Sequence, residues 1–134
     1  NDTIQNIDLV YNYGIFNFNA PNFLYRFVKG ETDYIVLPVQ YEYYLEEYEN
    51  RGVGLIEQVF NLTQEEKQAI FDALVINSLP ENRVYRNNYF YDNCSTRPRD
   101  IVEKYINGKI EYTPTNKSQT YRDLIHEHSK AQPW

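Results

Sequence analysis

The spacing of apolar residues changes repeatedly along the chain between a period of two and a period near three and a half. Residues 7–18 carry apolar side chains at alternate positions, which predicts a strand or a bent pair of strands. Shorter runs rich in aromatic or β-branched residues predict further extended segments at 34–37, 53–62, 84–91 and 109–112.

Helices are predicted where apolar residues recur at three- and four-residue spacing between start and stop signals. The predicted helices cover 20–29, a segment from Tyr41 to the C-cap residue Gly52, a segment from Thr63 to the turn-forming residues 77–82, then 94–106 and 118–129. The clearest start is the capping box formed by Thr63 and Glu66, whose side chains satisfy two otherwise unpaired amides.

Strands and helices do not follow one another in strict βαβ order. We therefore predict an α+β fold with a mainly antiparallel sheet rather than a doubly wound parallel one. No internal repeat, low-complexity tract or linker divides the chain, which predicts a single domain over residues 1–134.

Composition adds three expectations. Fourteen tyrosines and seven phenylalanines must supply much of the core, since apolar residues make up 42% of the 134 residues. A net charge of -6 argues against a nucleic-acid partner. The chain starts without methionine or a signal pattern and has no apolar stretch of about 20 residues, so we expect a fragment of a longer, membrane-associated protein.

Cys94 is the only cysteine, so its candidate roles are core residue, redox thiol or nucleophile. In the helix predicted over 94–106, it shares an inward face with Ile101 and Tyr105. Asn93 is a good N-cap residue, and the first amides of a helix favour a thiolate over a thiol. Arg97 and Arg99 either add positive potential or lie solvated, and a buried structural cysteine remains the alternative to catalysis.

The only histidines are His126 and His128. His128 follows Tyr121 and Leu124 at helical spacing and is predicted to face inward, which makes it a candidate base for the thiol; a core or helix-end histidine is the alternative. An i, i+2 pair points in opposite directions on a helix, so the two histidines cannot share a metal ion. With a single cysteine, we predict no metal site and no cofactor.

Several separated blocks resemble the Lnb N-terminal periplasmic domain family, in the same order along nearly the whole chain. These are Val10-Tyr11-Asn12-Tyr13-Gly14-Ile15-Phe16-Asn17-Phe18, Pro21-Asn22-Phe23 with Phe27-Val28-Lys29-Gly30, Leu79-Pro80-Glu81-Asn82-Arg83, Tyr89-Phe90-Tyr91-Asp92-Asn93-Cys94-Ser95-Thr96-Arg97 and Tyr121-Arg122-Asp123-Leu124-Ile125.

This resemblance implies a permuted papain-like fold and a role in bacterial lipoprotein N-acylation, in the periplasm or cell envelope. Cys94 would take an acyl group from a lipid donor as a thioester and pass it to the amino terminus of a lipoprotein. The family arrangement implies a histidine base in a Gly-His block upstream of Tyr11, a point that precedes this sequence. Asn12 would orient the imidazole, and Asn93 and Ser95 would shape the site or supply oxyanion donors.

Two other functions stay open. A cysteine hydrolase acting on peptide or cell-wall amides would use the same thiol. A non-catalytic, aromatic-rich binding module would expose a continuous aromatic patch and have no cleft at Cys94.

Overall fold

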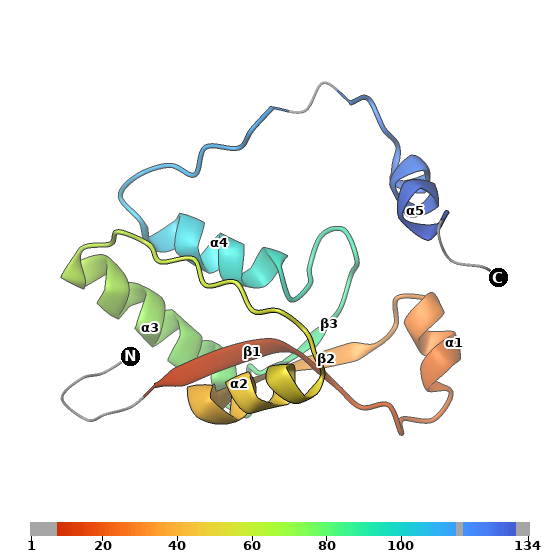
Figure 1. Cartoon of the computed structure of the whole chain (residues 1–134), viewed down its shortest axis with the longest axis horizontal. Coiled ribbons are helices and arrows are strands. Elements are labelled where there is room, and N and C mark those ends of the chain that lie inside the picture. Colours follow the sequence, from red (N-terminus) through yellow and green to blue (C-terminus); the bar gives the residue numbers. More distant parts are fainter. Residues whose placement is uncertain (1–7, 115–116, 131–134) are drawn as a thin grey trace.

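The computed structural model describes residues 8–114 and 117–130, and within them the fold is α+β (Figure 1). The elements in chain order are β1 (Leu9–Phe16), α1 (Phe23–Val28), β2 (Asp33–Gln40), α2 (Tyr41–Asn50), α3 (Gln64–Ser78), β3 (Val84–Arg86), α4 (Thr96–Tyr105) and α5 (Tyr121–Ser129). The strands form one antiparallel sheet in the order β1-β2-β3. The predicted fold class and antiparallel sheet are confirmed.

β1 is one strand with an irregularity near its middle. Its register against β2 shifts between Asn12, which pairs with Leu37, and Ile15, which pairs with Ile35. The Gly14 amide donates a hydrogen bond of 2.8 Å to the side-chain oxygen of Asn12 at this point. The extra residue locally bends the strand, as a β-bulge does.

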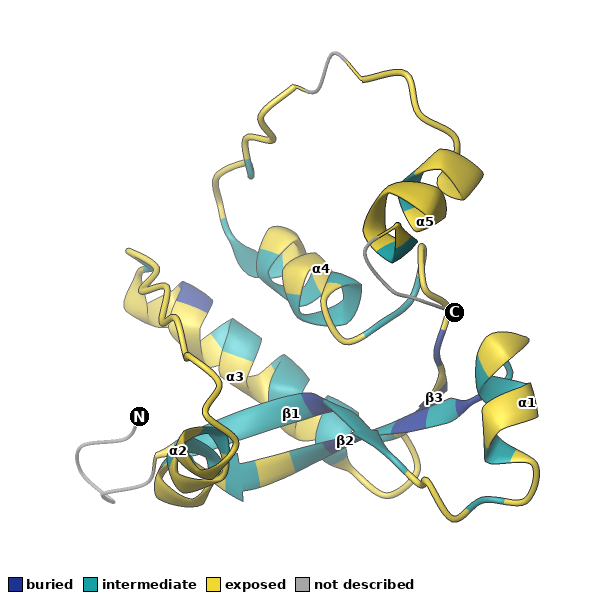
Figure 2. Cartoon of the chain, turned by 45° about the vertical axis from the view of Figure 1, so that its right-hand side comes forward, coloured by how far each residue is buried: buried dark blue, intermediate teal, exposed yellow. Residues whose placement is uncertain are grey.

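The core is small and aromatic, as the composition predicted. Its buried members are Tyr13, Tyr34, Val36 and Tyr85, all from the strands, and they appear dark blue in Figure 2. Leu74 of α3 and Ile101 of α4 pack against this cluster, so these two helices cover the same part of the sheet.

α3 and α4 are joined by a buried carboxylate. The predicted capping box is present: Glu66 accepts from the Thr63 amide at 2.8 Å, and the Thr63 hydroxyl accepts from the Glu66 amide at 3.2 Å. The other oxygen of Glu66 accepts from the amide of Asn107, just beyond α4, at 2.7 Å. These backbone hydrogen bonds, that from Asn107 first, lower the pKa of Glu66.

Helices form at each predicted place, with different ends. Gly52 has a φ of 63°, the left-handed conformation expected of the residue that ends α2. α1 is shorter than predicted. α5 begins at Tyr121 because Thr120 is its N-cap, with Asp123 completing a second capping box.

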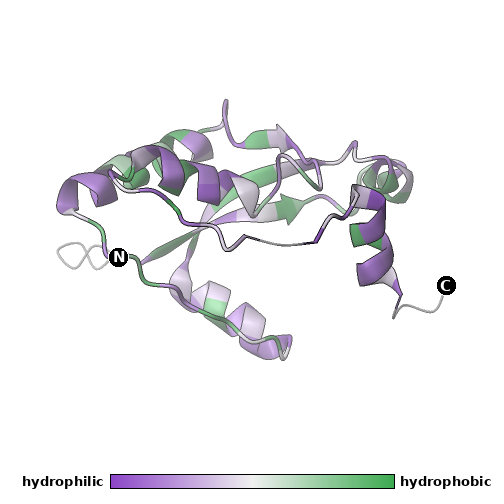
Figure 3. Cartoon of the chain, turned by 90° about the horizontal axis from the view of Figure 1, so that it is seen from above, coloured by the Kyte–Doolittle hydropathy of each residue, from purple (hydrophilic) through white to green (hydrophobic). Residues whose placement is uncertain are grey.

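Two strand predictions are wrong, because residues 53–62 and 109–112 adopt no regular structure. The first segment exposes Ile56 and Val59, which are 96% and 82% accessible. A strand needs a partner edge, and neither segment pairs with another strand in the described ranges. Figure 3 shows the apolar residues concentrated on the sheet, while much of the helical surface is hydrophilic.

Among residues 8–114 and 117–130, no helix has the length and apolar content needed to cross a bilayer.

Candidate functional site

The segment between β3 and α4 closes into a tight loop that carries Cys94 at its end. Asn88 and Asp92 pair across this loop, with N–H to carbonyl distances of 2.7 and 3.2 Å. The Asn88 side-chain oxygen accepts from the amides of Phe90 and Tyr91, both at 3.1 Å, as asparagine does in turns. The segment predicted as extended over 84–91 is therefore a strand only through Arg86.

Asn93 holds this loop and the start of α4 together. Its side-chain oxygen accepts from the amides of Ser95 and Thr96 at 2.9 and 3.1 Å, as the side chain of an N-cap residue would. Thr96 returns the bond, because its hydroxyl accepts from the Asn93 amide at 2.8 Å. The amide nitrogen of the Asn93 side chain donates to the carbonyls of Asn88 and Tyr89. The N-cap residue of α4 is Ser95, whose side chain makes no capping hydrogen bond, so Asn93 closes the turn before the helix and is not the N-cap that was predicted.

Cys94 lies between this turn and the first regular turn of α4, and it is exposed. The prediction that it lies within the helix and faces inward is wrong. Pro98 has no N–H to donate to the Cys94 carbonyl, so the regular helix begins only at Thr96. Within the described residues, the Cys94 amide has no hydrogen-bond acceptor, whereas the Ser95 amide is bound by Asn93.

An open pocket of about 580 Å³ lies at Cys94. It is lined by Tyr34, Asn87, Tyr89, Phe90, Asn93, Cys94, Ser95, Thr96, Tyr121 and Leu124, so the sheet, the loop and the starts of α4 and α5 all contribute. The Phe90 and Tyr121 rings are 4.3 Å apart, which brings α5 against the loop. Most of the wall away from the thiol is therefore aromatic.

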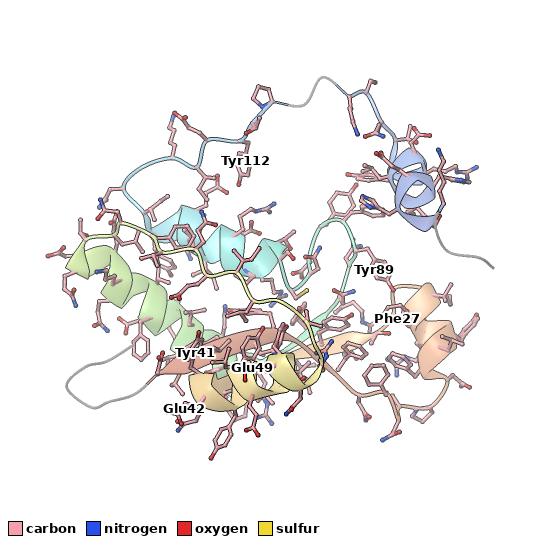
Figure 4. All side chains as sticks on the ribbon, in the orientation of Figure 1. Phe27, Tyr41, Glu42, Glu49, Tyr89 and Tyr112 are labelled. Carbon is pink, nitrogen blue, oxygen red and sulfur yellow. The ribbon has the colours of Figure 1, made fainter. Side chains whose placement is uncertain are left out.

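The loop is also anchored to α1. Tyr89 donates its hydroxyl hydrogen to the Phe27 carbonyl at 2.8 Å, and the two rings meet edge to face (Figure 4). This contact fixes the aromatic side of the pocket from a helix far away in the sequence.

Arg97 is neither solvated nor directed at the thiol. It forms two hydrogen bonds with the Asp92 carboxylate, of 2.5 and 2.8 Å, and its guanidinium lies 4.0 Å from the centre of the Tyr85 ring. Arg99 pairs with its neighbour Asp100 on the exposed face. Both cations are therefore held by carboxylates, and Arg97 braces the loop against the sheet.

The pKa of Tyr34 and that of Tyr85 are raised mainly by burial, and a negative charge on Cys94 raises both further. The thiol thus lies close enough to this aromatic pair for its charge to be felt there.

The other predicted site residues lie elsewhere. The Asn12 side-chain oxygen is bound to the Gly14 amide in the bulge, and Asn12 does not line the pocket. His128 is exposed, so the prediction that it faces inward is wrong: the residues of α5 that line the pocket are Tyr121 and Leu124, at the start of the helix. His126 is exposed as well.

Three of the ten pocket residues, Asn93, Cys94 and Ser95, were predicted as site residues, and Asn87 is among those that were not. Asn87 is 4% exposed, and its side chain has no hydrogen-bond partner among the described residues. Its amide continues the β2-β3 ladder by donating to the Thr32 carbonyl at 3.0 Å. The period of two from Tyr85 was the available signal, because it places residues 85 and 87 on the same face.

Residues 8–114 and 117–130 contain no group of three or more histidine, cysteine, aspartate or glutamate side chains that could hold a metal ion.

Residues 1–127 match the family described as the Lnb N-terminal periplasmic domain. No curated protein and no solved structure matches the chain. Because the match covers nearly the whole sequence, the chain belongs to this family, and its place is the periplasm.

Proposed function

We propose that this domain transfers acyl groups through a thioester on Cys94, with a lipid ester as the donor and the amino terminus of a lipoprotein as the acceptor. The observation that carries the proposal is an exposed cysteine that lines a largely aromatic pocket, directly after a turn closed by Asn93. A thiol on a helix start packed against an antiparallel sheet is also compatible with a permuted papain-like arrangement.

The pocket suits an acyl substrate. Tyr89, Phe90, Tyr121 and Leu124 give it apolar walls, and burying each methylene of an acyl chain against such walls contributes about 0.8 kcal/mol. Asn93, Ser95 and Thr96, which are neighbours of Cys94 in the chain, add polar groups to the lining beside the thiol.

The transfer has two steps. The Cys94 sulfur attacks the ester carbonyl carbon, an S–C bond forms, the C–O bond breaks, and the proton lost by the thiol ends on the leaving alcohol. The amine nitrogen then attacks the thioester carbon, an N–C bond forms, the C–S bond breaks, and the proton lost by the amine ends on the sulfur and regenerates the thiol.

The base that moves these protons is proposed to be the upstream histidine implied by the family resemblance. Neither described histidine lines the pocket, which favours this assignment over His128. Asn12 keeps its proposed role of orienting that imidazole, although its side-chain oxygen already accepts a hydrogen bond from Gly14.

The cleft at Cys94 supports an enzyme over a binding module, since a module needs no pocket at its cysteine. A hydrolase acting on peptide or cell-wall amides is the second candidate, because the same thiol could attack an amide and release the acyl group to water. The acceptor separates the two enzymes.

The test uses the full-length protein with phosphatidylethanolamine as the donor. Intact-mass measurement is expected to show one added acyl group that neutral hydroxylamine removes, as it does for a thioester. A peptide amine added afterwards should discharge the acyl group and become an amide.

The control variants are Cys94→Ala, which should gain no acyl group, and Cys94→Ser, whose oxygen ester would resist neutral hydroxylamine. An equal mass gain in Cys94→Ala would refute the proposal. Cleavage of a peptide amide without transfer to the amine would assign the hydrolase function instead.

A further inference from the structure

We propose that the side-chain amide of Asn87 donates a hydrogen bond to the carbonyl oxygen of the acyl group that reacts with Cys94. The proposal rests on the proposed function, because it requires an acyl carbonyl at the thiol. It adds the residue that directly follows β3 to a pocket built from β2, the loop and the starts of α4 and α5.

The first support is the unsatisfied state of Asn87. Asn87 is only 4% exposed, yet its side chain has no hydrogen-bond partner in the described part of the chain. Among the described residues, Thr32 Oγ1 is the one fully buried polar side-chain atom without a partner, so the amide atoms of Asn87 stay accessible and free to bind a further group. Asn87 lines the pocket at Cys94, where a substrate would supply that group.

The second support is the main-chain N–H of Cys94 itself, which makes no hydrogen bond within the described residues. Asn93 binds the next two amides, those of Ser95 and Thr96. Asn87 and Cys94 both line the pocket, and in the described residues neither the Asn87 side chain nor the Cys94 main-chain N–H has a hydrogen-bond partner. A carbonyl oxygen that becomes negative during attack is stabilised by such a pair of fixed donors.

Tyr34 is the competing group on this wall. It is 8% exposed, it lines the pocket, and its hydroxyl also has no partner in the described residues. Its ring, however, is held between other rings, stacked on Phe16 at 4.9 Å and edge to face with Tyr85 at 5.9 Å. The two groups therefore need separate variants.

The experiment compares two reactions of the same thiol in the full-length protein. Acylation by a p-nitrophenyl ester passes through a negatively charged oxygen, whereas alkylation by iodoacetamide does not. Asn87→Leu has nearly the shape of asparagine without its donors, and it is expected to slow acylation about 10²–10³-fold while alkylation stays within about threefold. Asn87→Ala serves as a second variant should the leucine fit poorly.

Stability supplies an independent readout. Because Asn87→Leu removes a polar group that makes no hydrogen bond within the described residues, the thermal midpoint should stay nearly unchanged. Slower acylation in a protein that is no less stable is the signature of a substrate contact.

Three results would overturn the proposal. Undiminished acylation in Asn87→Leu removes the role, and an equal fall in acylation and alkylation makes Asn87 a residue that positions the thiol. A fall in Tyr34→Phe without one in Asn87→Leu assigns the contact to the tyrosine. Absence of acylation in the wild type refutes the proposed function as well, so the two failures are distinguishable.

Discussion

Replacing Tyr85 by phenylalanine tests the hydrogen bond at the centre of the core. The Tyr85 hydroxyl donates to the Tyr13 carbonyl at 2.7 Å in a buried environment, and Tyr85 is 4% exposed. The variant keeps the ring, its place in the core and its contact with Arg97. The variant removes one buried hydrogen bond and leaves the buried Tyr13 carbonyl without its donor. This loss should lower the free energy of unfolding by about 1–3 kcal/mol.

Tyr34→Phe is the matched control. Tyr34 is paired with Tyr85 across β2 and β3, and it loses the same atom, but its hydroxyl has no partner in the described residues. Its free energy of unfolding should change by less than about 0.5 kcal/mol, since a hydroxyl without a partner in the protein contributes no hydrogen bond that phenylalanine would lack.

Urea denaturation at neutral pH measures both variants, because the phenols are neutral there and unfolding exposes the same surface in each. The expected result is a lower midpoint for Tyr85→Phe at an unchanged denaturant slope. Equal losses in the two variants would refute the reasoning, since the effect would then come from the ring environment and not from the bond to Tyr13.

Three further predictions concern the turn at Asn93, the buried carboxylate and the tyrosines. Asn93→Ala should destabilise the protein by about 1–2 kcal/mol in urea denaturation. Asn93→Asp should cost less, because aspartate keeps the oxygen that accepts from the Ser95 amide and loses only the donors to Asn88 and Tyr89. Equal losses in the two variants would contradict the role of that oxygen. Because the pKa of Glu66 is lowered, its contribution to folding stability is present above the unfolded pKa near 4.5 and is lost as the pH falls through the folded pKa. Glu66→Gln should therefore weaken the fall in stability at acid pH. An unchanged fall would contradict this. Burial, followed by the hydrogen bond with Tyr48, raises the pKa of Tyr44 to about 12, and burial also raises the pKa of Tyr13 and Tyr85. The stability that these neutral phenols contribute is therefore complete below the unfolded pKa near 10 and is lost at higher pH. Tyrosinate absorbance should rise late and together with unfolding, and complete ionisation near pH 10 in the folded state would refute this prediction.

The features predicted correctly from sequence are those set by a few neighbouring residues. The capping box of Thr63 and Glu66 needs only four positions, and Gly52 ends α2 because it alone adopts the required left-handed backbone easily. The strand predicted at 53–62 failed because apolar content describes a segment and not its partner, and pairing is a long-range property. The inward orientation predicted for His128 failed likewise, because helical spacing selects a face but not how far the covering surface extends.

The site shows the same division, and the order Asn93-Cys94-Ser95-Thr96 explains it. An N-cap side chain satisfies the amides two and three positions ahead, and in the same way Asn93 binds those of Ser95 and Thr96. The amide directly after Asn93 is the one that this geometry leaves unbound, and here it belongs to Cys94. That position gives the proposed nucleophile a fixed backbone and a free N–H at once, and both follow from the sequence. The second proposed donor, the Asn87 side chain, does not follow from the sequence, because nothing near Asn87 in the chain shows that its side chain has no partner. Only the folded structure shows this.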